Sequence, residues 1–181
     1  MLTQFSFVHK GEKTMVPEIL KAFFFEAMRH GWTSDQAQFV TKEYDGWKEK
    51  TWVFTSPNFP NFQLIDQYRT FSNSRVSEGK KSISFSGIPV WYMVYGGWYN
   101  KQVIPFLKRA LARNYNEGVF IGGRGPDRLE GEDHTLQYLN RVQQNDFANF
   151  GGHEWIEATS PHSGMSAGTK LGEHHYFGGK I

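Results

Sequence analysis

Apolar residues recur at helical spacing in two segments of the chain. In residues 17–30 they fall three and four positions apart, which places them on one face of a helix. Pro17 suits the first turn of this helix, and Gly31 suits its end. A second stripe occupies residues 102–113, and its members are Val103, Phe106, Leu107, Ala110 and Leu111. The sequence therefore predicts two amphipathic helices, each with an apolar face to bury.

Elsewhere apolar and polar residues alternate with a period of two, which is typical of strands. Asp45-Gly46 lies between two such runs and is the pair favoured in a two-residue hairpin turn. The predicted strands are residues 36–44, 47–55, 62–71, 82–85, 89–95, 146–150, 153–158 and 173–177. Residues 72–81 are polar and predict an exposed turn, and the sequence after the second helix is loop-like up to Thr135.

Residues 89–95 are apolar on both faces, because Trp91, Met93 and Tyr95 alternate with other apolar residues. Such a strand is expected at the centre of a sheet. Together the patterns predict one α+β domain over residues 1–181. Its mainly antiparallel, curved sheet carries the two helices on one side and has an aromatic-rich core.

The composition supports a β-rich fold. The 16 Phe, 8 Tyr and 6 Trp make up 17% of the 181 residues, and aromatic residues favour strands and fill thick cores. Some of these rings could instead line a pocket. The chain has no cysteine, which excludes disulfides, thiolate metal sites and cysteine nucleophiles.

The charges argue against two classes of partner. The net charge is only +2, and Lys and Arg are spread along the chain, so we expect no nucleic-acid partner. The apolar runs are too short to span a membrane, and residues 1–13 lack the layout of a signal peptide. We therefore expect a soluble cytoplasmic protein with no membrane partner.

Five short motifs follow one another in the second part of the chain. They are GIPVWYMVYGG at 87–97, FLKRAL at 106–111, RGP at 124–126, DFANFGGHEWI at 146–156 and FGGKI at 177–181. In this order they resemble the DUF5680 family, a bacterial domain of unknown function, over roughly residues 62–181. Members of that family occur alone or behind a helix-turn-helix DNA-binding domain of the XRE type. This chain departs from the family pattern at residues 93–97. The resemblance supports the predicted fold and implies no particular reaction.

Arg124 stands in the glycine-rich segment Gly122–Gly125, where two readings are open. Successive backbone N–H groups with a guanidinium beside them suit a phosphate or a carboxylate. Alternatively, the segment is a turn, and Arg124 pairs with a carboxylate at the edge of the core, such as Glu154.

Histidines and glutamates gather late in the chain: His153, His162, His174 and His175 with Glu154, Glu157 and Glu173. Two paired strands could assemble a metal site or an acid–base pair from them. However, their spacing matches no specific metal motif, and ordinary surface histidines are the simpler interpretation. We expect no metal and no cofactor.

These observations favour ligand binding over catalysis. We expect a small polar or anionic ligand in a pocket lined by Trp91, Tyr95 and Trp98, with Arg124 as polar anchor and Glu154 as a second polar group. One alternative is a hydrolase-type enzyme that uses Glu154 with His153 or His175 as acid or base. Another is a protein–protein interaction module with exposed rings, and a homodimer is a further option.

Overall fold

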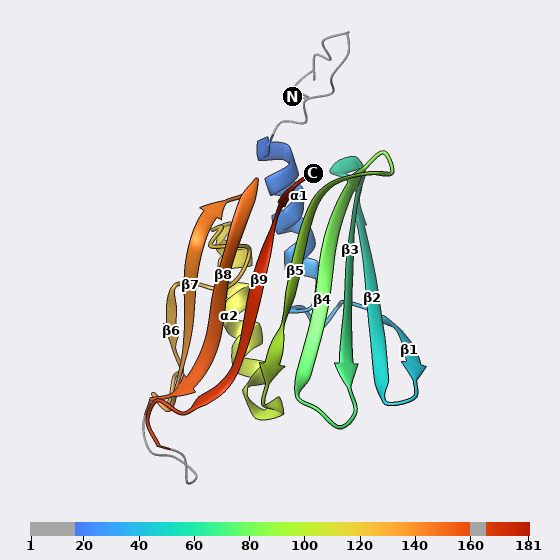
Figure 1. The fold of residues 1–181 in the computed structure, drawn as a ribbon. Helices are drawn as coiled ribbons and strands as arrows, with labels where there is room; N and C mark the ends of the chain where they lie inside the picture. The colour runs from blue at the N-terminus through green and yellow to red at the C-terminus, as the bar shows by residue number, and fades with distance from the viewer. Residues whose placement is uncertain (1–16, 160–165) are drawn as a thin grey trace.

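The computed structural model describes residues 17–159 and 166–181 (Figure 1). Within these residues, two α-helices, a short 3₁₀ segment and nine strands follow one another. The helices are α1 (Pro17–His30), η1 (Lys101–Val103) and α2 (Ile104–Glu117). The strands are β1 (Val40–Tyr44), β2 (Trp47–Ser56), β3 (Phe59–Phe71), β4 (Val76–Phe85), β5 (Ile88–Tyr99), β6 (Arg128–Glu130), β7 (Leu136–Asp146), β8 (Asn149–Ala158) and β9 (Lys170–Lys180).

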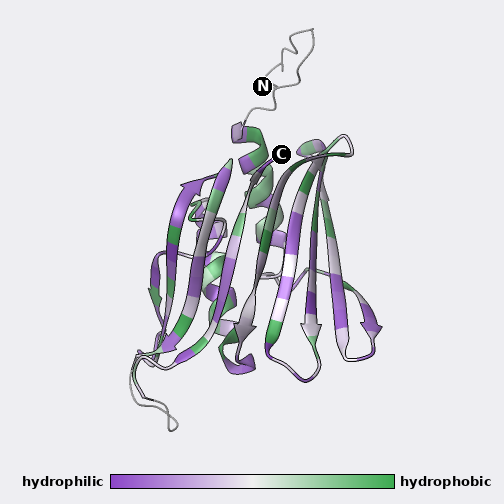
Figure 2. Cartoon of the chain, viewed as in Figure 1, coloured by the Kyte–Doolittle hydropathy of each residue, from purple (hydrophilic) through white to green (hydrophobic). Residues whose placement is uncertain are grey.

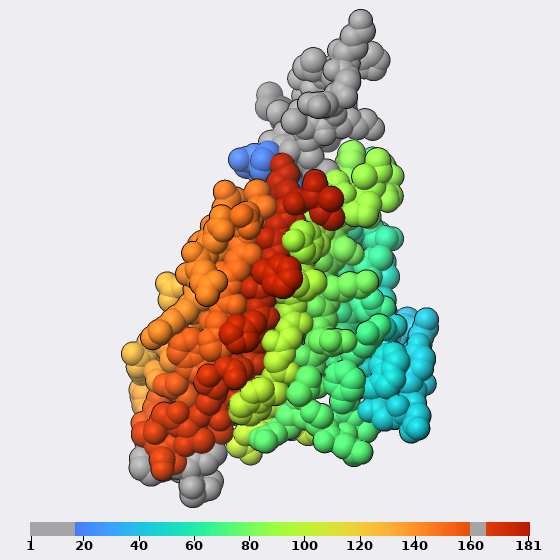
Figure 3. All heavy atoms as spheres, viewed as in Figure 1, coloured from blue at the N-terminus to red at the C-terminus, as the bar shows by residue number. Residues whose placement is uncertain are grey.

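All nine strands form one antiparallel sheet in the order β1-β2-β3-β4-β5-β9-β8-β7-β6. The sheet is open, and β1 and β6 are its two edges. The last strand of the chain therefore lies at the centre, between β5 and β8, which Figure 3 shows as a red band between green and orange ones. The predicted central position of residues 89–95 is confirmed.

Both helices lie behind the sheet in Figure 1, so they cover the same, inner face. Hydrophilic and hydrophobic residues alternate along the strands (Figure 2), because successive side chains point to opposite faces. The inner face and the helices enclose a largely aromatic core around Phe23, Phe24, Trp91 and Phe150. The predicted α+β class, the antiparallel sheet and the aromatic core are therefore confirmed.

Glycines on the inner face make room for large rings on the neighbouring strand. Gly79 pairs with Tyr95, and Gly172 pairs with Tyr99. A Cβ on Gly79 would lie 2.5 Å from the Tyr95 ring, and one on Gly172 would lie 2.1 Å from the Tyr99 ring. Both rings lie across the glycine of the adjacent strand, and this fixes two tyrosines at the centre of the inner face.

The sequence patterns located the helices correctly, but they did not locate the polar strands β4 and β7. The bounds of α1 and the Asp45-Gly46 turn agree with the prediction, and α2 runs slightly further, to Glu117. The exposed turn predicted for residues 72–81 is wrong, because most of that segment belongs to β4. Strand β7 was also missed, as was the short strand β6, which lies within the segment predicted to be loop-like, and β8 begins after the turn that follows Asp146. Strands β4 and β7 carry polar residues on the inner face, which hides the alternation.

The described residues contain no helix that is long and apolar enough to cross a membrane. Two parts of the sequence predictions concern residues that lie outside the described ones. They are the layout of residues 1–13, which bears on a signal peptide, and His162, one member of the predicted histidine group.

Candidate functional site

A cavity lies between the inner face of the sheet and the two helices. The volume open to the centres of water-sized molecules is about 120 Å³. Seven of its lining residues are only half-buried, and five of them place its opening between the segment after α1 and the adjacent ends of β3 and β4. These five are Trp32, Thr33, Tyr68, Thr70 and Ser77.

The helices supply an apolar wall to this cavity. Ile104, Leu107, Leu111 and Tyr115 follow one another along α2 at spacings of three and four residues, so they share one helical face. Met28, near the end of α1, continues the same wall. A ligand in the cavity therefore meets hydrocarbon on its helix side.

The strands supply a polar wall opposite. Its residues are Ser77 and Lys81 from β4, Tyr95 and Tyr99 from β5, and His174 from β9, joined by Arg124 from the loop after α2. Ser77 and Lys81 are an even number of positions apart on β4, and so are Tyr95 and Tyr99 on β5. The two residues of each strand therefore point to the same inner face. The cavity is thus amphipathic, with imidazole and cationic groups on the strand side only, whereas the Tyr115 hydroxyl on the helix side donates to the Gly123 carbonyl.

Two buried ion pairs stand behind the polar wall. In the first, Lys81 binds Asp66, its directly opposite residue on β3, and the Tyr95 hydroxyl donates to the same carboxylate over 3.1 Å. Burial lowers the pKa of Lys81, and the negative charge of Asp66 offsets part of that effect. Burial also raises the pKa of Tyr95 well above its usual range, so its hydroxyl keeps its proton.

In the second pair, Arg124 binds Glu154 of β8, and the Tyr138 hydroxyl donates to the other carboxylate oxygen over 2.5 Å. The Arg124 side chain is 4% exposed and that of Glu154 is 0% exposed, so water screens this pair little. Burial alone would raise the pKa of Glu154, but the Arg124 guanidinium outweighs it, and the pKa is lowered. The carboxylate is therefore ionised at neutral pH.

The glycine-rich loop around Arg124 is built into the protein rather than open to an anion. Gly122 donates its N–H to Asn145, Arg124 donates to the Ile121 carbonyl, and Gly125 donates to the Tyr138 hydroxyl. These bonds use three of the four backbone donors that an anion-binding nest in this segment would need. Of the two readings of the loop, the structure shows the turn with Arg124 paired to Glu154.

Three polar groups at the cavity are left without a well-formed hydrogen bond among the described residues. They are Arg124 Nε, His174 Nδ1 and the Tyr99 hydroxyl, and all three are buried. His174 Nδ1 lies 3.9 Å from Glu154, beyond hydrogen-bond distance. Burial raises the pKa of Tyr99 well above its usual range, and the charge of Glu154 adds to the effect, together with a hydrogen bond to that carboxylate that is not well formed. Buried polar atoms almost always find a partner, so three in one cavity indicate that water or a ligand completes them.

We predict that His174 makes the free energy of unfolding depend on pH. Burial lowers the pKa of His174 from 6.5 to about 4, and the nearby Arg124 adds to the effect. Below pH 6.5 His174 becomes protonated in the unfolded chain, whereas in the folded protein it becomes protonated only near pH 4. We therefore expect urea unfolding to show a loss of about 2 kcal/mol between pH 7 and pH 5 from this residue.

The variant His174→Gln should lose this share of the pH dependence, since glutamine does not titrate. A matched variant, His175→Gln, changes the neighbouring residue, which is exposed on the other face of the sheet. An unfolding curve for His174→Gln that falls as steeply with pH as the wild type would contradict the assignment.

The structure brings together three of the five predicted site residues. Tyr95 and Arg124 line the cavity, and Glu154 holds Arg124 from behind. Trp91 faces the same side but is buried in the aromatic core, where its Nε1 donates to the Phe147 carbonyl. Trp98 lies on the outer face, where its Nε1 donates to Glu173 over 3.4 Å. Neither tryptophan is among the residues that line the cavity.

The acid–base pairs considered from the sequence are also separated. Glu154 points inward, whereas His153 and His175 point outward, because neighbouring residues of a strand face opposite sides. The histidine near Glu154 is His174. Sequence reasoning also missed Lys81 and Asp66. Asp66 follows Phe62 and Leu64 at intervals of two on a predicted strand, so its place on an apolar face was a visible signal of a buried polar partner.

Comparison with known proteins finds no family model, no curated protein and no solved structure that matches this chain. The resemblance to the DUF5680 family therefore stays a prediction. Function has to be argued from the geometry of the cavity alone.

Proposed function

We propose that this protein binds a small organic carboxylate in the cavity between α2 and the inner face of the sheet. The observation that carries the proposal is that Arg124 Nε, His174 Nδ1 and the Tyr99 hydroxyl, from three residues that line one cavity, are all buried and without a well-formed hydrogen bond. An arginine N–H and a tyrosine O–H donate, and a carboxylate accepts several such bonds at once.

The charge and the shape of the cavity restrict the class of ligand further. The two cations of the site, Lys81 and Arg124, are balanced by Asp66 and Glu154, so the cluster attracts through directed N–H and O–H groups rather than through net charge. The opposite wall is apolar, and the volume of about 120 Å³ approaches that of a cavity that holds benzene. Benzoate combines an apolar ring with a carboxylate, and because it is larger than benzene, part of it would extend into the opening of the cavity.

Tyr95 gives the site its rigidity. The Lys81 ammonium lies 5.1 Å from the centre of the Tyr95 ring, and the Arg124 guanidinium lies 5.3 Å from it. The ring also covers Gly79, and its hydroxyl donates to Asp66. A ring held by both cations and by the sheet keeps the donors in place before the ligand arrives, which lowers the entropy cost of binding.

The test is calorimetric titration and thermal melting with benzoate, benzamide and inorganic phosphate. We expect benzoate to raise the melting temperature and to bind more tightly than benzamide, because only the acid offers two charged acceptor oxygens. Tyr99→Phe should weaken benzoate binding about fivefold to tenfold, the worth of one hydrogen bond. It should leave the melting temperature of the ligand-free protein nearly unchanged, since the hydroxyl makes no well-formed hydrogen bond there.

Tyr92→Phe is the matched control, because Tyr92 contributes to the outer face and contacts Phe177. The proposal fails if no carboxylate stabilises the wild-type protein and native mass spectrometry finds no small acid carried through purification. It also fails if Tyr99→Phe and Tyr92→Phe bind benzoate as the wild type does.

A second candidate function rests on a separate contact in the same cavity. The Ser77 hydroxyl and His174 Nε2 are 3.0 Å apart, and His174 Nδ1 faces Glu154 at 3.9 Å. This is the residue order of a hydrolase in which serine attacks an ester and histidine accepts its proton. Two facts weigh against it: Arg124 and Tyr138 already occupy both oxygens of Glu154, and a pKa of about 4 makes His174 a weak base.

Hydrolysis of a nitrophenyl ester distinguishes the two functions. A hydrolase should lose its turnover in Ser77→Ala, whereas a binding protein should show no difference in ester hydrolysis between Ser77→Ala and the wild type.

A further inference from the structure

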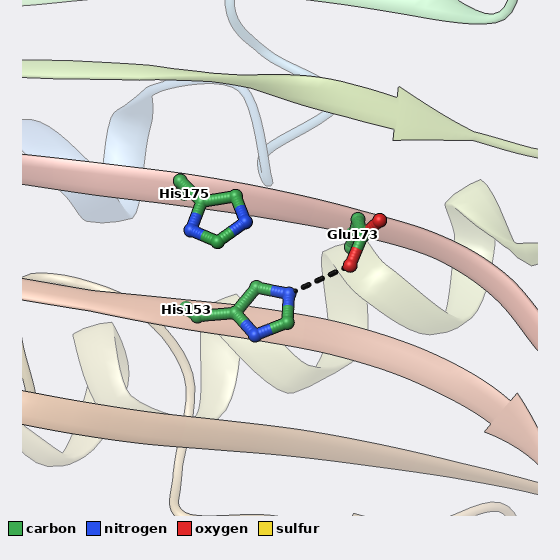
Figure 4. Close-up of side chains that lie close together, drawn as sticks. All are labelled: His153, Glu173 and His175. Carbon is green, nitrogen blue, oxygen red and sulfur yellow. Dashed lines mark hydrogen bonds and ion pairs between the residues drawn. The ribbon is translucent and has the colours of Figure 1, made fainter.

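Two histidines and a glutamate meet on the outer face of the sheet, away from the cavity (Figure 4). His153 of β8 is directly opposite His175 of β9, and Glu173 precedes His175 by two residues. All three therefore point to the same face. One ligand atom from each side chain can be chosen so that the three atoms lie within 4.8 Å of one another.

We propose that His153, Glu173 and His175 bind a divalent transition-metal ion, with Zn²⁺ as the best fit. Two imidazoles and one carboxylate are a ligand set that zinc accepts, with the fourth position left for water or a substrate. Imidazole nitrogen favours zinc, copper and nickel over magnesium or calcium. The proposal is independent of the carboxylate ligand, because the inward-facing cavity residues take no part in it.

The distances require only a local adjustment. Ligand atoms on one tetrahedral zinc lie about 3.4 Å apart, given bond lengths of about 2.1 Å. His153 Nε2 and Glu173 Oε2 are already 2.8 Å apart. The His153 and His175 rings are stacked, with centroids 4.2 Å apart and planes 5° from parallel. Since His175 is exposed, rotation of its ring is the movement that closes the site.

Neighbouring side chains already hold two of the ligands. The Trp155 ring stacks on His153 with centroids 5.0 Å apart, and Trp98 donates to the second oxygen of Glu173. Partners of this kind orient metal ligands and contribute to affinity. The three ligand residues lie on β8 and β9, two neighbouring central strands, so little backbone entropy is lost when the metal binds.

One cation competes with the metal. Lys170 donates to Glu173 Oε2 over 2.6 Å and is the main reason that the pKa of this carboxyl is lowered to about 2. Glu173 is thus ionised, but its oxygen is shared with a positive charge. Lys170 must release Glu173 for a metal to bind, so this lysine should set the affinity of the site.

Calorimetric titration with ZnCl₂, on protein without a polyhistidine tag, tests the proposal. We expect one zinc ion per chain in the wild type and a loss of affinity of about tenfold or more in His175→Ala and in His153→Ala. Lys170→Gln should bind zinc several-fold more tightly, because it removes the competing charge. Replacing zinc with Co²⁺ should give the visible absorption of a tetrahedral site, which is absent in His175→Ala.

His30→Ala serves as the control, since His30 is an exposed histidine at the end of α1. It should bind zinc as the wild type does. Saturable zinc binding that is lost equally in His30→Ala and His175→Ala, or a wild type that binds no zinc, overturns the proposal. Zinc binding unchanged in His153→Ala and His175→Ala overturns it as well. Each variant alters an exposed or half-exposed side chain, and a melting curve without metal verifies that it is folded.

Discussion

Replacing Arg124 with methionine should lower the free energy of unfolding by about 3–5 kcal/mol. The substitution leaves the Glu154 carboxylate fully buried with Tyr138 as its remaining close donor. A buried charge without a partner destabilises the folded state by far more than the intact pair stabilises it, because neither water nor protein then compensates the charge. Urea denaturation of the wild type and of Arg124→Met measures the difference.

The double variant Arg124→Met with Glu154→Leu is the control for this result. Replacing both members of a buried pair by apolar residues of similar size is often close to neutral. The double variant should therefore be more stable than Arg124→Met alone. If both variants are equally unstable, the loss comes from packing around the loop and not from the unbalanced charge. Arg124→Lys should also lower stability, because a lysine cannot reproduce the geometry of the guanidinium.

Features encoded by neighbouring residues were predictable from the sequence. The stripe of α1 and the Asp45-Gly46 turn depend on residues a few positions apart, so periodicity and turn chemistry suffice. The missed strand β4 depends on distant partners. Its polar segment is held by β3 on one side and β5 on the other, and its inward Lys81 is neutralised by Asp66 across the ladder.

The site was predictable only in part, for the same reason. The pairing of Arg124 with Glu154 was named from residue type alone, whereas the pairing of Lys81 with Asp66 requires the register of two strands. The position of Trp98 could have been found. It lies three residues after Tyr95 on one strand, and an odd separation puts the two side chains on opposite faces.

Distance along the strand explains why Trp91 is not a ligand-binding residue. It shares a face with Tyr95, but four residues of extended chain separate them by about 13 Å. That distance carries Trp91 out of the cavity and into the cluster with Phe147 and Phe150. The inner face is therefore divided along its length into an apolar aromatic region and a polar region, and the sequence motif that spans both does not reveal the boundary.

The second large effect is expected in the apolar region. Phe24 of α1 is 0% exposed, and its ring contacts five others, those of Phe25, Trp91, Tyr115, Phe120 and Phe147. These rings come from α1, β5, α2 and two loops, so Phe24 joins the helices to the sheet. Phe24→Ala should lower the free energy of unfolding by about 3–5 kcal/mol, because the surrounding rings cannot close the space that it leaves.

Phe177→Ala makes the same chemical change at a residue that is 57% exposed on the outer face, and it should cost less than about 1 kcal/mol. Urea midpoints of the two variants give the comparison directly. Equal midpoints would mean that α1 does not depend on Phe24 to dock on the sheet. A large gap with an unchanged denaturant slope would show that one aromatic side chain holds the helical layer, and with it the apolar wall of the cavity, against the sheet.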